Sequence, residues 1–291
     1  MLRDLSESLH VSRQYLWPSS RRARMDRCLT MRWGDCTSTQ IAQLELERRV
    51  GLVPVGATEQ HGPHLPTDTD TRIAQAICDG AAARCDATIV MPAVAIGCSL
   101  GHGTVFPGTL SLFPEELTML LVRYAEWSAL SGLKRLVFVN AHMGNTASLA
   151  AATDRLRFLR PDLKSTWVDW WSANPEITAE VSADGQDIHA NRAETSIVLH
   201  LWPDVVHVDA MIAADDEDRT GELAFRYTAE VLSRNGVTGM PSLATASLGQ
   251  SLYAAVVHHV VAKVRAGLSE EPPLARFSEP VSTTQWISGG S

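Results

Sequence analysis

Four short apolar runs constrain the fold of this 291-residue chain more than any other feature of its sequence. They are VGLVPVGA at 50–57, ATIVMPAVA at 87–95, RLVFVNA at 135–141 and STWVDWW at 165–171. Because these runs do not alternate apolar with polar residues, they are typical of strands buried on both faces. Helical patterns lie between them, at residues 69–85, 113–132 and 145–159. This alternation predicts an α/β fold with a mostly parallel sheet and helices on both of its faces.

The helical pattern at 113–132 has both of its ends marked. Pro114 suits the first helical turn, and Gly132 suits the residue that stops a helix. We expect an apolar stripe along one face of this helix, made by Leu117, Leu120, Leu121 and Tyr124.

The length of the chain and its 45% content of hydrophobic residues suffice for one sizeable core, so we expect a single domain at residues 31–270. The stretch SSRRARMDR near the start is rich in arginine and has no apolar period. We therefore expect residues 1–30 to form a disordered N-terminal arm, and residues 271–291 to form a C-terminal tail.

Charge, hydropathy and cysteine content exclude several classes of protein. The formal net charge is −8 and the body of the chain has no tract of lysine and arginine, so neither nucleic acid nor an anionic membrane is an expected partner. No apolar run reaches the roughly 18 residues of a transmembrane helix. The five cysteines contain no Cys-x-x-Cys pair, which argues against a disulfide framework and a thiolate zinc site. We expect reduced thiols in a cytoplasmic protein.

Residues that bind metals or transfer protons gather where the predicted strands end. Glu59 and His61 follow the first strand, Asp70 closes the same loop, and His142 directly follows the third strand. Chemistry in a parallel sheet is placed outside the carboxyl ends of the strands. On an extended segment Glu59 and His61 point the same way, because side chains alternate with a period of two. These four side chains predict a metal site.

A simpler explanation exists for the aspartates of this loop. Asp68 or Asp70 would cap the following helix, and an aspartate before a helix usually does only that. The capping explanation does not extend to the glutamate and the two histidines, because unpaired polar groups at buried strand ends are costly without a ligand.

Four segments resemble, in order and spacing, those of the creatininase (creatinine amidohydrolase) family. They are PVGATEQHGPHLPTDTD at 54–70, VFPGTLSL at 105–112, NAHMGN at 140–145 and HANRAETS at 189–196. The resemblance runs from about Trp33 to Gly267 and implies a creatininase-like fold. Residues 50–75 and 236–252 look most like the mycofactocin-associated branch, whose members resemble metal-dependent peptidases that trim a short precursor peptide.

The resemblance implies that five residues bind two divalent metal ions, with Asp70 bridging the ions. The implied ligands are Glu59, His61, Asp70, His142 and Glu194. Three carboxylates and two dications leave a charge of +1 (4 − 3), which a bridging hydroxide cancels; such a metal pair activates water. Oxygen and nitrogen ligands without a thiolate suit zinc, manganese or iron(II).

The resemblance also implies that His189 and Glu194 are catalytic. His189 would act as a general acid, which gives a proton to the leaving nitrogen after water has attacked the amide. A histidine beside a metal pair can instead hold a ligand in place, and this alternative stays open.

Several departures from the family pattern concern the substrate. Creatinine-hydrolysing members carry a Tyr and a metal-binding Glu at the positions of Met143 and Gly144, so we do not expect creatinine to be the substrate. The family's Gly and Glu after the catalytic histidine are Asn191 and Arg192 here. The stretch that contains His102 is one residue longer than the family pattern.

Three residues are expected to contact the substrate, and they are Trp171, Arg192 and His102. Arg192 would bind a substrate carboxylate through two hydrogen bonds. Of the neighbours Trp170 and Trp171, one is expected to line the pocket and the other to pack in the core, because strand residues alternate faces.

We therefore predict a metal-dependent amidohydrolase that cleaves the C–N bond of a small cyclic amide or a short peptide. Two alternatives stay open, a creatinine amidohydrolase proper and a non-catalytic metal-binding assembly protein. A nucleotide-binding module is a weaker alternative, because GATEQHG lacks the G-x-G-x-x-G spacing. The resemblance also implies a homo-oligomer, commonly a hexamer.

Overall fold

All four predicted strands are present in the computed structural model, which describes residues 31–103 and 105–273. They are β1 (Val50–Val55), β2 (Thr88–Val90), β3 (Arg135–Asn140) and β4 (Lys164–Asp169). The strands form one sheet in the order β2-β1-β3-β4, and every neighbouring pair is parallel. The predicted parallel α/β fold is therefore confirmed. The expected arm at 1–30 and residues 274–291 of the expected tail lie outside the described residues.

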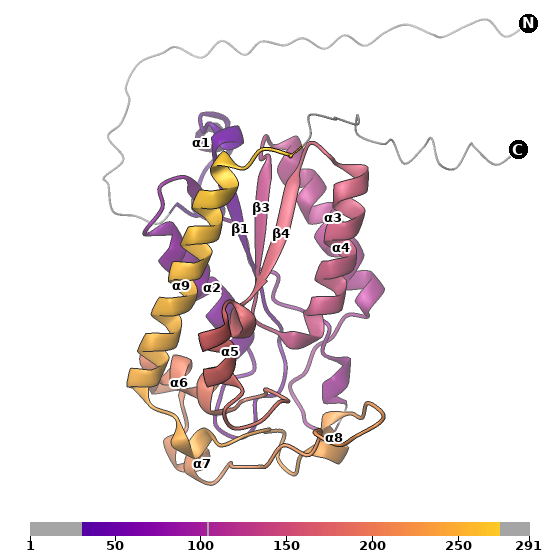
Figure 1. The fold of residues 1–291 in the computed structure, drawn as a ribbon, viewed down its shortest axis with the longest axis vertical. Coiled ribbons are helices and arrows are strands. Elements are labelled where there is room, and N and C mark those ends of the chain that lie inside the picture. Colours follow the sequence, from indigo (N-terminus) through magenta and orange to yellow (C-terminus); the bar gives the residue numbers. More distant parts are fainter. Residues whose placement is uncertain (1–30, 104, 274–291) are drawn as a thin grey trace, which may run out of the picture.

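Helices cover both faces of this sheet (Figure 1). One face carries α2 (Thr69–Ala82) and α9 (Ala246–Ser269), and the other carries α3 (Pro114–Leu130) and α4 (Thr146–Leu159). In β1, Leu52 packs in the α2 and α9 layer, whereas its neighbour Val53 packs in the α3 and α4 layer. Both faces of β1 are therefore buried, which explains why its sequence is apolar throughout.

Helix α3 follows its sequence signals closely. Pro114 is its first residue, and Gly132 beyond its end has a φ of 114°, a left-handed conformation that favours glycine. Leu117 and Leu121 of the expected stripe are fully buried. Leu120 was wrongly assigned to the stripe, because it is 39% exposed at the edge of the buried face.

Two predicted strands end earlier than their apolar runs. β2 stops at Val90, and beyond it only Val94 pairs with β1, at Val55. Pro92 lies between these two points and has no N–H to donate to a neighbouring strand. β4 stops at Asp169, and the following tryptophans belong to a 3-10 turn, Trp170–Ser172.

The remaining helices are short. They are α1 (Ser38–Ala42), α5 (Pro175–Val181), α6 (Arg192–Leu201), α7 (Val208–Ile212) and α8 (Ala229–Leu232). The other 3-10 turns are Trp33–Asp35, Leu46–Arg48, Leu100–His102, Met143–Asn145, Pro203–Val205 and Pro241–Leu243. Helices α5 to α8 lie around the carboxyl end of the sheet (Figure 1). Within residues 31–103 and 105–273, no helix is both long and apolar enough to cross a membrane.

Residues 213–245 run between α7 and α9 and are called the long loop below. Apart from α8 and one 3-10 turn, this segment has no helix or strand. It lies at the carboxyl end of the sheet, opposite α1 (Figure 1). The loop therefore reaches the edge of the sheet at which the sequence predicts the chemistry.

Candidate metal centre

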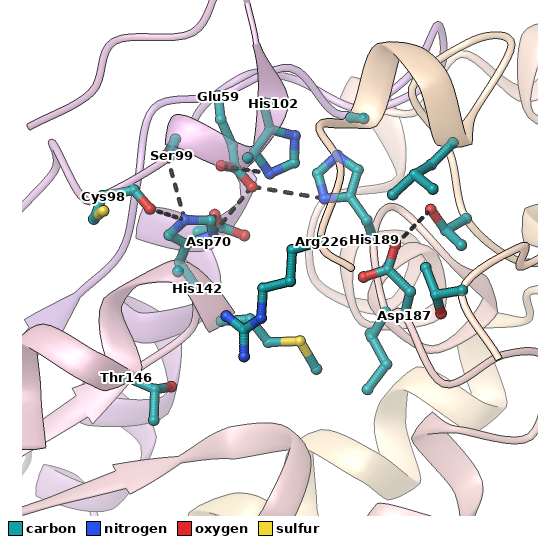
Figure 2. Close-up of a pocket in the computed structure, with 18 of the residues that line it drawn as sticks. Glu59, Asp70, Cys98, Ser99, His102, His142, Thr146, Asp187, His189 and Arg226 are labelled. Carbon is teal, nitrogen blue, oxygen red and sulfur yellow. Dashed lines mark hydrogen bonds and ion pairs between the residues drawn. The ribbon is translucent and has the colours of Figure 1, made fainter. Parts of the chain in front are cut away.

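The six residues predicted to bind metal or to catalyse come together at the carboxyl end of the sheet. They are Glu59, His61, Asp70, His142, His189 and Glu194, and all six are buried. A cavity of about 650 Å³ is lined by five of them, and His61 is the one that is not among its lining residues. Figure 2 shows four of these residues on the wall of the cavity, and they are Glu59, Asp70, His142 and His189.

The loop after β1 and the start of α2 approach closely, and this approach brings Asp70 to Glu59. Gly56 makes it possible, because a β-carbon at this position would collide with the backbone of Thr71. The Thr71 hydroxyl also donates to the carbonyl of Ala57 at 3.0 Å. Any larger residue at position 56 would push α2, and Asp70 with it, away from the site.

The capping explanation for the aspartates does not hold in this structure. Asp68 is the N-cap residue of α2, but its side chain makes no capping hydrogen bond and pairs with Arg72 instead. Asp70 lies inside the first turn and is 1% exposed. Its carboxylate faces the other acidic and imidazole groups, so its burial is not explained by the helix.

Asn145 holds three segments of the site together. Its side-chain amide donates to the carbonyl of Gly56 at 2.9 Å and to the Asn140 side chain at 3.2 Å. Its side-chain oxygen accepts from the backbone N–H of Cys98 at 2.9 Å. The ends of β1 and β3 and the loop at 97–103 are therefore fixed to one another, which positions the side chains that they carry.

Asp70 lies between two groups of side chains. Its Oδ1 is 3.1 Å from Nε2 of His61, and its Oδ2 is 3.4 Å from Nδ1 of His142. The first group, His61, Asp70 and Glu194, has donor atoms close enough to share one ion. On the other side, Glu59 Oε1 is 3.1 Å from Nδ1 of His142. Below, "Glu194 subsite" denotes His61, Asp70 and Glu194, and "Glu59 subsite" denotes Glu59, His142 and Oδ2 of Asp70.

Backbone carbonyls orient three imidazole rings of the site. His61 Nδ1 donates to the carbonyl of Glu59 at 3.2 Å, and His142 Nε2 donates to that of Cys98 at 3.0 Å. His189 Nε2 donates to the carbonyl of Gln60 at 2.8 Å. In each ring the other nitrogen then faces the carboxylates. Metal-binding histidines are usually held in this way, with one N–H on a carbonyl and the free nitrogen on the ion.

The electrostatics of the cluster fit a site for cations. Burial alone would lower the pKa of His61, but the Asp70, Glu194 and Glu59 carboxylates raise it to about 10. Burial also opposes a charge on His142, yet Glu59 and Asp70 raise its pKa to about 9. Protons on these rings thus occupy the places where dications would neutralise the carboxylates.

The carboxylates themselves are short of partners. Both oxygens of Glu59 and Oδ2 of Asp70 are buried without a hydrogen-bond partner. Burial, with a smaller contribution from the Asp70 carboxylate, raises the pKa of Glu194 to about 8. Because buried unpaired carboxylate oxygens are costly, their gathering here fits a pair of divalent ions held by this ligand set.

Glu194 is held by the backbone just before α6. Ala190 has a φ of 50°, which is rare for a residue with a side chain, and its N–H donates to Oε2 of Glu194 at 2.6 Å. Asn191 caps the helix, since its side-chain oxygen accepts from the N–H groups of Ala193 and Glu194. The unusual backbone at Ala190 therefore fixes one oxygen of Glu194 and leaves the other to the site.

The three expected substrate contacts have different outcomes in this structure. Trp171 lines the cavity, while its neighbour Trp170 is fully buried in the core; this is the expected division, although both lie in a 3-10 turn and not in the strand whose alternation predicted it. Arg192 is not among the described residues that line the cavity. Its guanidinium bonds to the carbonyl and the carboxylate of Glu180, at 3.0 and 2.5 Å. His102 lines the cavity, but its nearest charged neighbour is Glu59.

Sequence reasoning missed three residues of this region. Gln60, between the two residues singled out after β1, donates to the carbonyl of Gly236 at 2.9 Å and contacts the rings of His102 and His189. Its position within the motif was a usable signal. Asp187 and Arg226 also line the cavity, and neither lies in a periodic pattern that would have revealed it.

Comparison with known proteins was made with this geometry in hand. The family model described as "Creatininase: Creatinine amidohydrolase" matches residues 34–264. A "Mycofactocin precursor peptide peptidase" of Mycolicibacterium smegmatis is 40% identical over 223 residues, which cover 74% of this chain and 83% of that protein.

Two solved structures resemble the fold. One, described as "Crystal structure of creatinine amidohydrolase (creatininase)", is 25% identical with a TM-score of 0.73 and covers 83% of this chain and 99% of its own. The other, described as "Creatininase Mn", is 25% identical with a TM-score of 0.70 and covers 83% of this chain and 100% of its own.

Proposed function

Because the chain belongs to the creatininase family and is thus a hydrolase acting on C–N bonds, we propose that it cleaves a short peptide with water activated by two divalent metal ions. Family membership also argues against the alternative of a non-catalytic metal-binding protein. The observation that carries the proposal is the position of Asp70, whose two oxygens face the two subsites separately.

The side chains that would hold the ions are those of the two subsites. His61, Asp70 and Glu194 form one set, and Glu59, His142 and Asp70 form the other. Two ions in these places would lower the pKa of a bound water and polarise the substrate carbonyl. The donor set, carboxylate oxygen and imidazole nitrogen without thiolate, suits zinc, manganese or iron(II).

We propose that His189 moves a proton in this reaction. Its Nε2 is occupied by the carbonyl of Gln60, and its Nδ1 is 3.6 Å from Oε1 of Glu59. Burial and the neighbouring rings of His102 and His61 hold the pKa of His189 well below its ordinary value. A neutral ring with a free Nδ1 can take a proton from water and pass it to the leaving nitrogen.

The cavity favours a short peptide over creatinine or another small cyclic amide. Its volume of about 650 Å³ lies within the range of pockets that hold drug-sized ligands. Arg226 is the one lysine or arginine among the described residues that line it, and in the described part of the chain it has no ion-pair or hydrogen-bond partner. A peptide carboxylate would supply that partner, and creatinine has none.

The proposal is tested by measuring metal content and peptide cleavage together. Purified protein should hold close to two divalent ions per chain and release amine from short peptides, with chelation abolishing the activity and re-addition restoring it. Turnover of creatinine equal to that of the best peptide would instead support the creatinine amidohydrolase alternative.

Assembly and compartment stay predictions. The described cysteines, Cys36, Cys78, Cys85 and Cys98, are free thiols, which suits a reducing cytoplasm. Sedimentation of the purified protein would test the expected homo-oligomer, commonly a hexamer in the family.

A further inference from the structure

We propose that His102 is a metal ligand of the Glu59 subsite, in place of the substrate contact expected from its sequence context. The inference rests on the proposed metal dependence but not on the identity of the substrate. His102 ends the 3-10 turn Leu100–His102, and its side chain is 13% exposed. Figure 2 shows its ring beside Glu59, on the wall of the cavity that also carries His142.

The two imidazoles approach Glu59 at its two different oxygens. Nε2 of His102 is 3.0 Å from Oε2, and Nδ1 of His142 is 3.1 Å from Oε1. One donor atom from each of the three residues can be chosen so that all lie within 4.8 Å of one another. Donors that bind one ion at about 2.1 Å lie roughly 3 to 4 Å apart, so the three residues are spaced to surround an ion.

The contact between His102 and Glu59 is close without being a hydrogen bond. Oε2 of Glu59 is buried and has no hydrogen-bond partner, although Nε2 of His102 is 3.0 Å away. A proton on Nε2 is therefore not aimed at the carboxylate. The imidazole nitrogen and the carboxylate oxygen are close to each other but are not aligned for a hydrogen bond. Two ligands that bind one ion between them have this arrangement.

The Glu59 subsite can take one more protein donor. Glu59, His142 and Asp70 supply one side chain each, an activated water would be the fourth ligand, and zinc sites of this kind expand to five ligands. The turn after His142 offers none: Gly144 has no side chain, and a β-carbon there would collide with the carbonyl of Cys98. Asn145 is engaged with three other groups.

The loop that closes over Gly144 is also the loop that carries His102. Cys98 accepts from Nε2 of His142 through its carbonyl, and the hydroxyl of Ser99 is 3.3 Å from the same nitrogen. Three residues later, the backbone N–H of His102 donates to the carbonyl of Ser99 at 3.1 Å. One short segment thus orients the ring of His142 and presents a second ring to the same carboxylate.

Coordination through Nε2 has a consequence for Gln60. The ring proton of His102 would then lie on Nδ1, which is 3.1 Å from the carboxamide nitrogen of Gln60. The carboxamide must turn its oxygen toward the ring to accept this proton. That turn gives up the bond from Gln60 to the carbonyl of Gly236 and the bond that Gln60 accepts from the N–H of Gly62, and the metal–nitrogen bond must outweigh both.

The assignment of His102 as a ligand predicts which metal the Glu59 subsite prefers. His102 would add a second imidazole nitrogen to that of His142, and it would leave the negative charge of the ligand set unchanged. Imidazole suits zinc and iron better than manganese, which prefers oxygen. We therefore expect the Glu59 subsite to bind zinc or iron(II) more tightly than manganese.

The test compares His102→Ala, His102→Asp and a matched control, His258→Ala, on the exposed side of α9. Zinc stoichiometry and affinity are measured by dialysis and chelator competition, and cobalt(II) replaces zinc to report coordination by its visible absorption. Loss of a ligand should weaken one of the two ions by more than about 100-fold, since loss of a mere ligand-orienting partner costs about 10- to 100-fold.

The variants separate ligation from other roles. His102→Ala should keep the ion of the Glu194 subsite, lose the other and change the cobalt spectrum, while His102→Asp should recover part of the affinity with a shift toward manganese. His258→Ala should match the wild type. Two tightly bound ions in His102→Ala, with an unchanged cobalt spectrum, would overturn the inference and leave the proposed function intact. A wild type that binds no metal would overturn both.

Discussion

The cavity has two kinds of wall, and they differ in how they are built. One wall is formed by the loops that follow β1 and β3, at 55–70 and 140–145, where most polar side chains are buried and Asn145 joins neighbouring segments. The other wall belongs to the long loop, which contributes Leu223, Phe225, Arg226 and Tyr227, all of them exposed. The first wall carries Glu59, Asp70 and His142 of the candidate metal centre, and the second faces a molecule that enters the cavity.

We infer from this difference that chemistry and selection of the substrate belong to separate walls of the cavity. The long loop is held by hydrogen bonds near its ends, and residues 221–227 in its middle are exposed. Asp216 accepts from Arg219 at 2.7 Å, from Ser233 at 2.9 Å and from the N–H of Arg234 at 2.7 Å. Changes in the first wall should therefore affect metal content and rate, and changes in the second wall should affect binding of the substrate.

The largest effect is expected at Asp70. Asp70→Asn removes the negative charge that both subsites share and replaces one of the two oxygen donors with a nitrogen that does not bind metal, so metal content should fall below about one ion per chain. Because metal ions contribute several kcal/mol to such reactions, kcat/KM should fall by about 10³-fold or more. Elemental analysis and peptide cleavage measure the two effects. Undiminished metal in this variant would show that Asp70 does not bridge the subsites.

His189 and His142 should respond differently to the same change. His189→Ala should keep both ions and bind substrate nearly normally, while kcat falls by about 10² to 10⁴, the usual contribution of a general acid or base. His142→Ala should lose metal as well as rate. Paired measurements of metal content and kcat distinguish them. A metal-depleted His189 variant would make His189 a ligand or a support for one, and an unchanged kcat would mean that the proton comes from elsewhere.

Arg226 tests the second wall. Arg226→Ala should raise KM for a peptide with a free carboxylate by about 10- to 100-fold, the worth of a charged hydrogen bond, with little change in kcat or metal content. The same peptide with a C-terminal amide should be unaffected. Arg234→Ala, at an exposed arginine of the same loop, is the control. An equal loss on the acid and the amide would contradict a contact with the terminal carboxylate.

The smallest effect is expected at the anchored end of the long loop. Burial alone would raise the pKa of Asp216, but Arg219, the backbone of Arg234 and Ser233 lower it below its ordinary value. Asp216→Asn should therefore destabilise the protein by about 1–2 kcal/mol in urea unfolding at pH 7. Glu222→Gln, on the exposed middle of the loop, should change the stability by less than about 0.5 kcal/mol.

The pH dependence of this difference has a definite sign. A carboxyl group whose pKa is lower in the folded state contributes its full stability above the unfolded pKa, which is about 3.9. The gap between wild type and Asp216→Asn should stay constant from pH 7 to about 5. It should narrow as the pH falls below about 4, through the lowered pKa of Asp216. A gap that is equally large at low pH would rule out a role for the charge.

Much of the sheet and of the candidate metal centre was predictable, because both depend on local patterns. Continuous apolar runs identified the strands, and the position of Glu59, His61 and His142 just after them identified the edge where they meet. The structure does not bring Arg192 to the cavity, because a neighbouring acid, Glu180 of α5, pairs with its guanidinium, and no spacing in the sequence reveals such a pair. Leu120 was misplaced for a related reason, since the width of a buried stripe depends on what packs against it.

The sequence by itself determined the order of strands and helices, the edge of the sheet that carries chemistry and the types of ligand available there. These follow from periodicity and from the geometry of parallel sheets, which act over a few residues. Only the tertiary structure decided that Asp70 faces two subsites, that His102 reaches Glu59 and that Arg226 is the one lysine or arginine among the described residues that line the cavity. These contacts join segments far apart in the chain, and their distances depend on how whole layers pack, for example on the close approach that Gly56 permits.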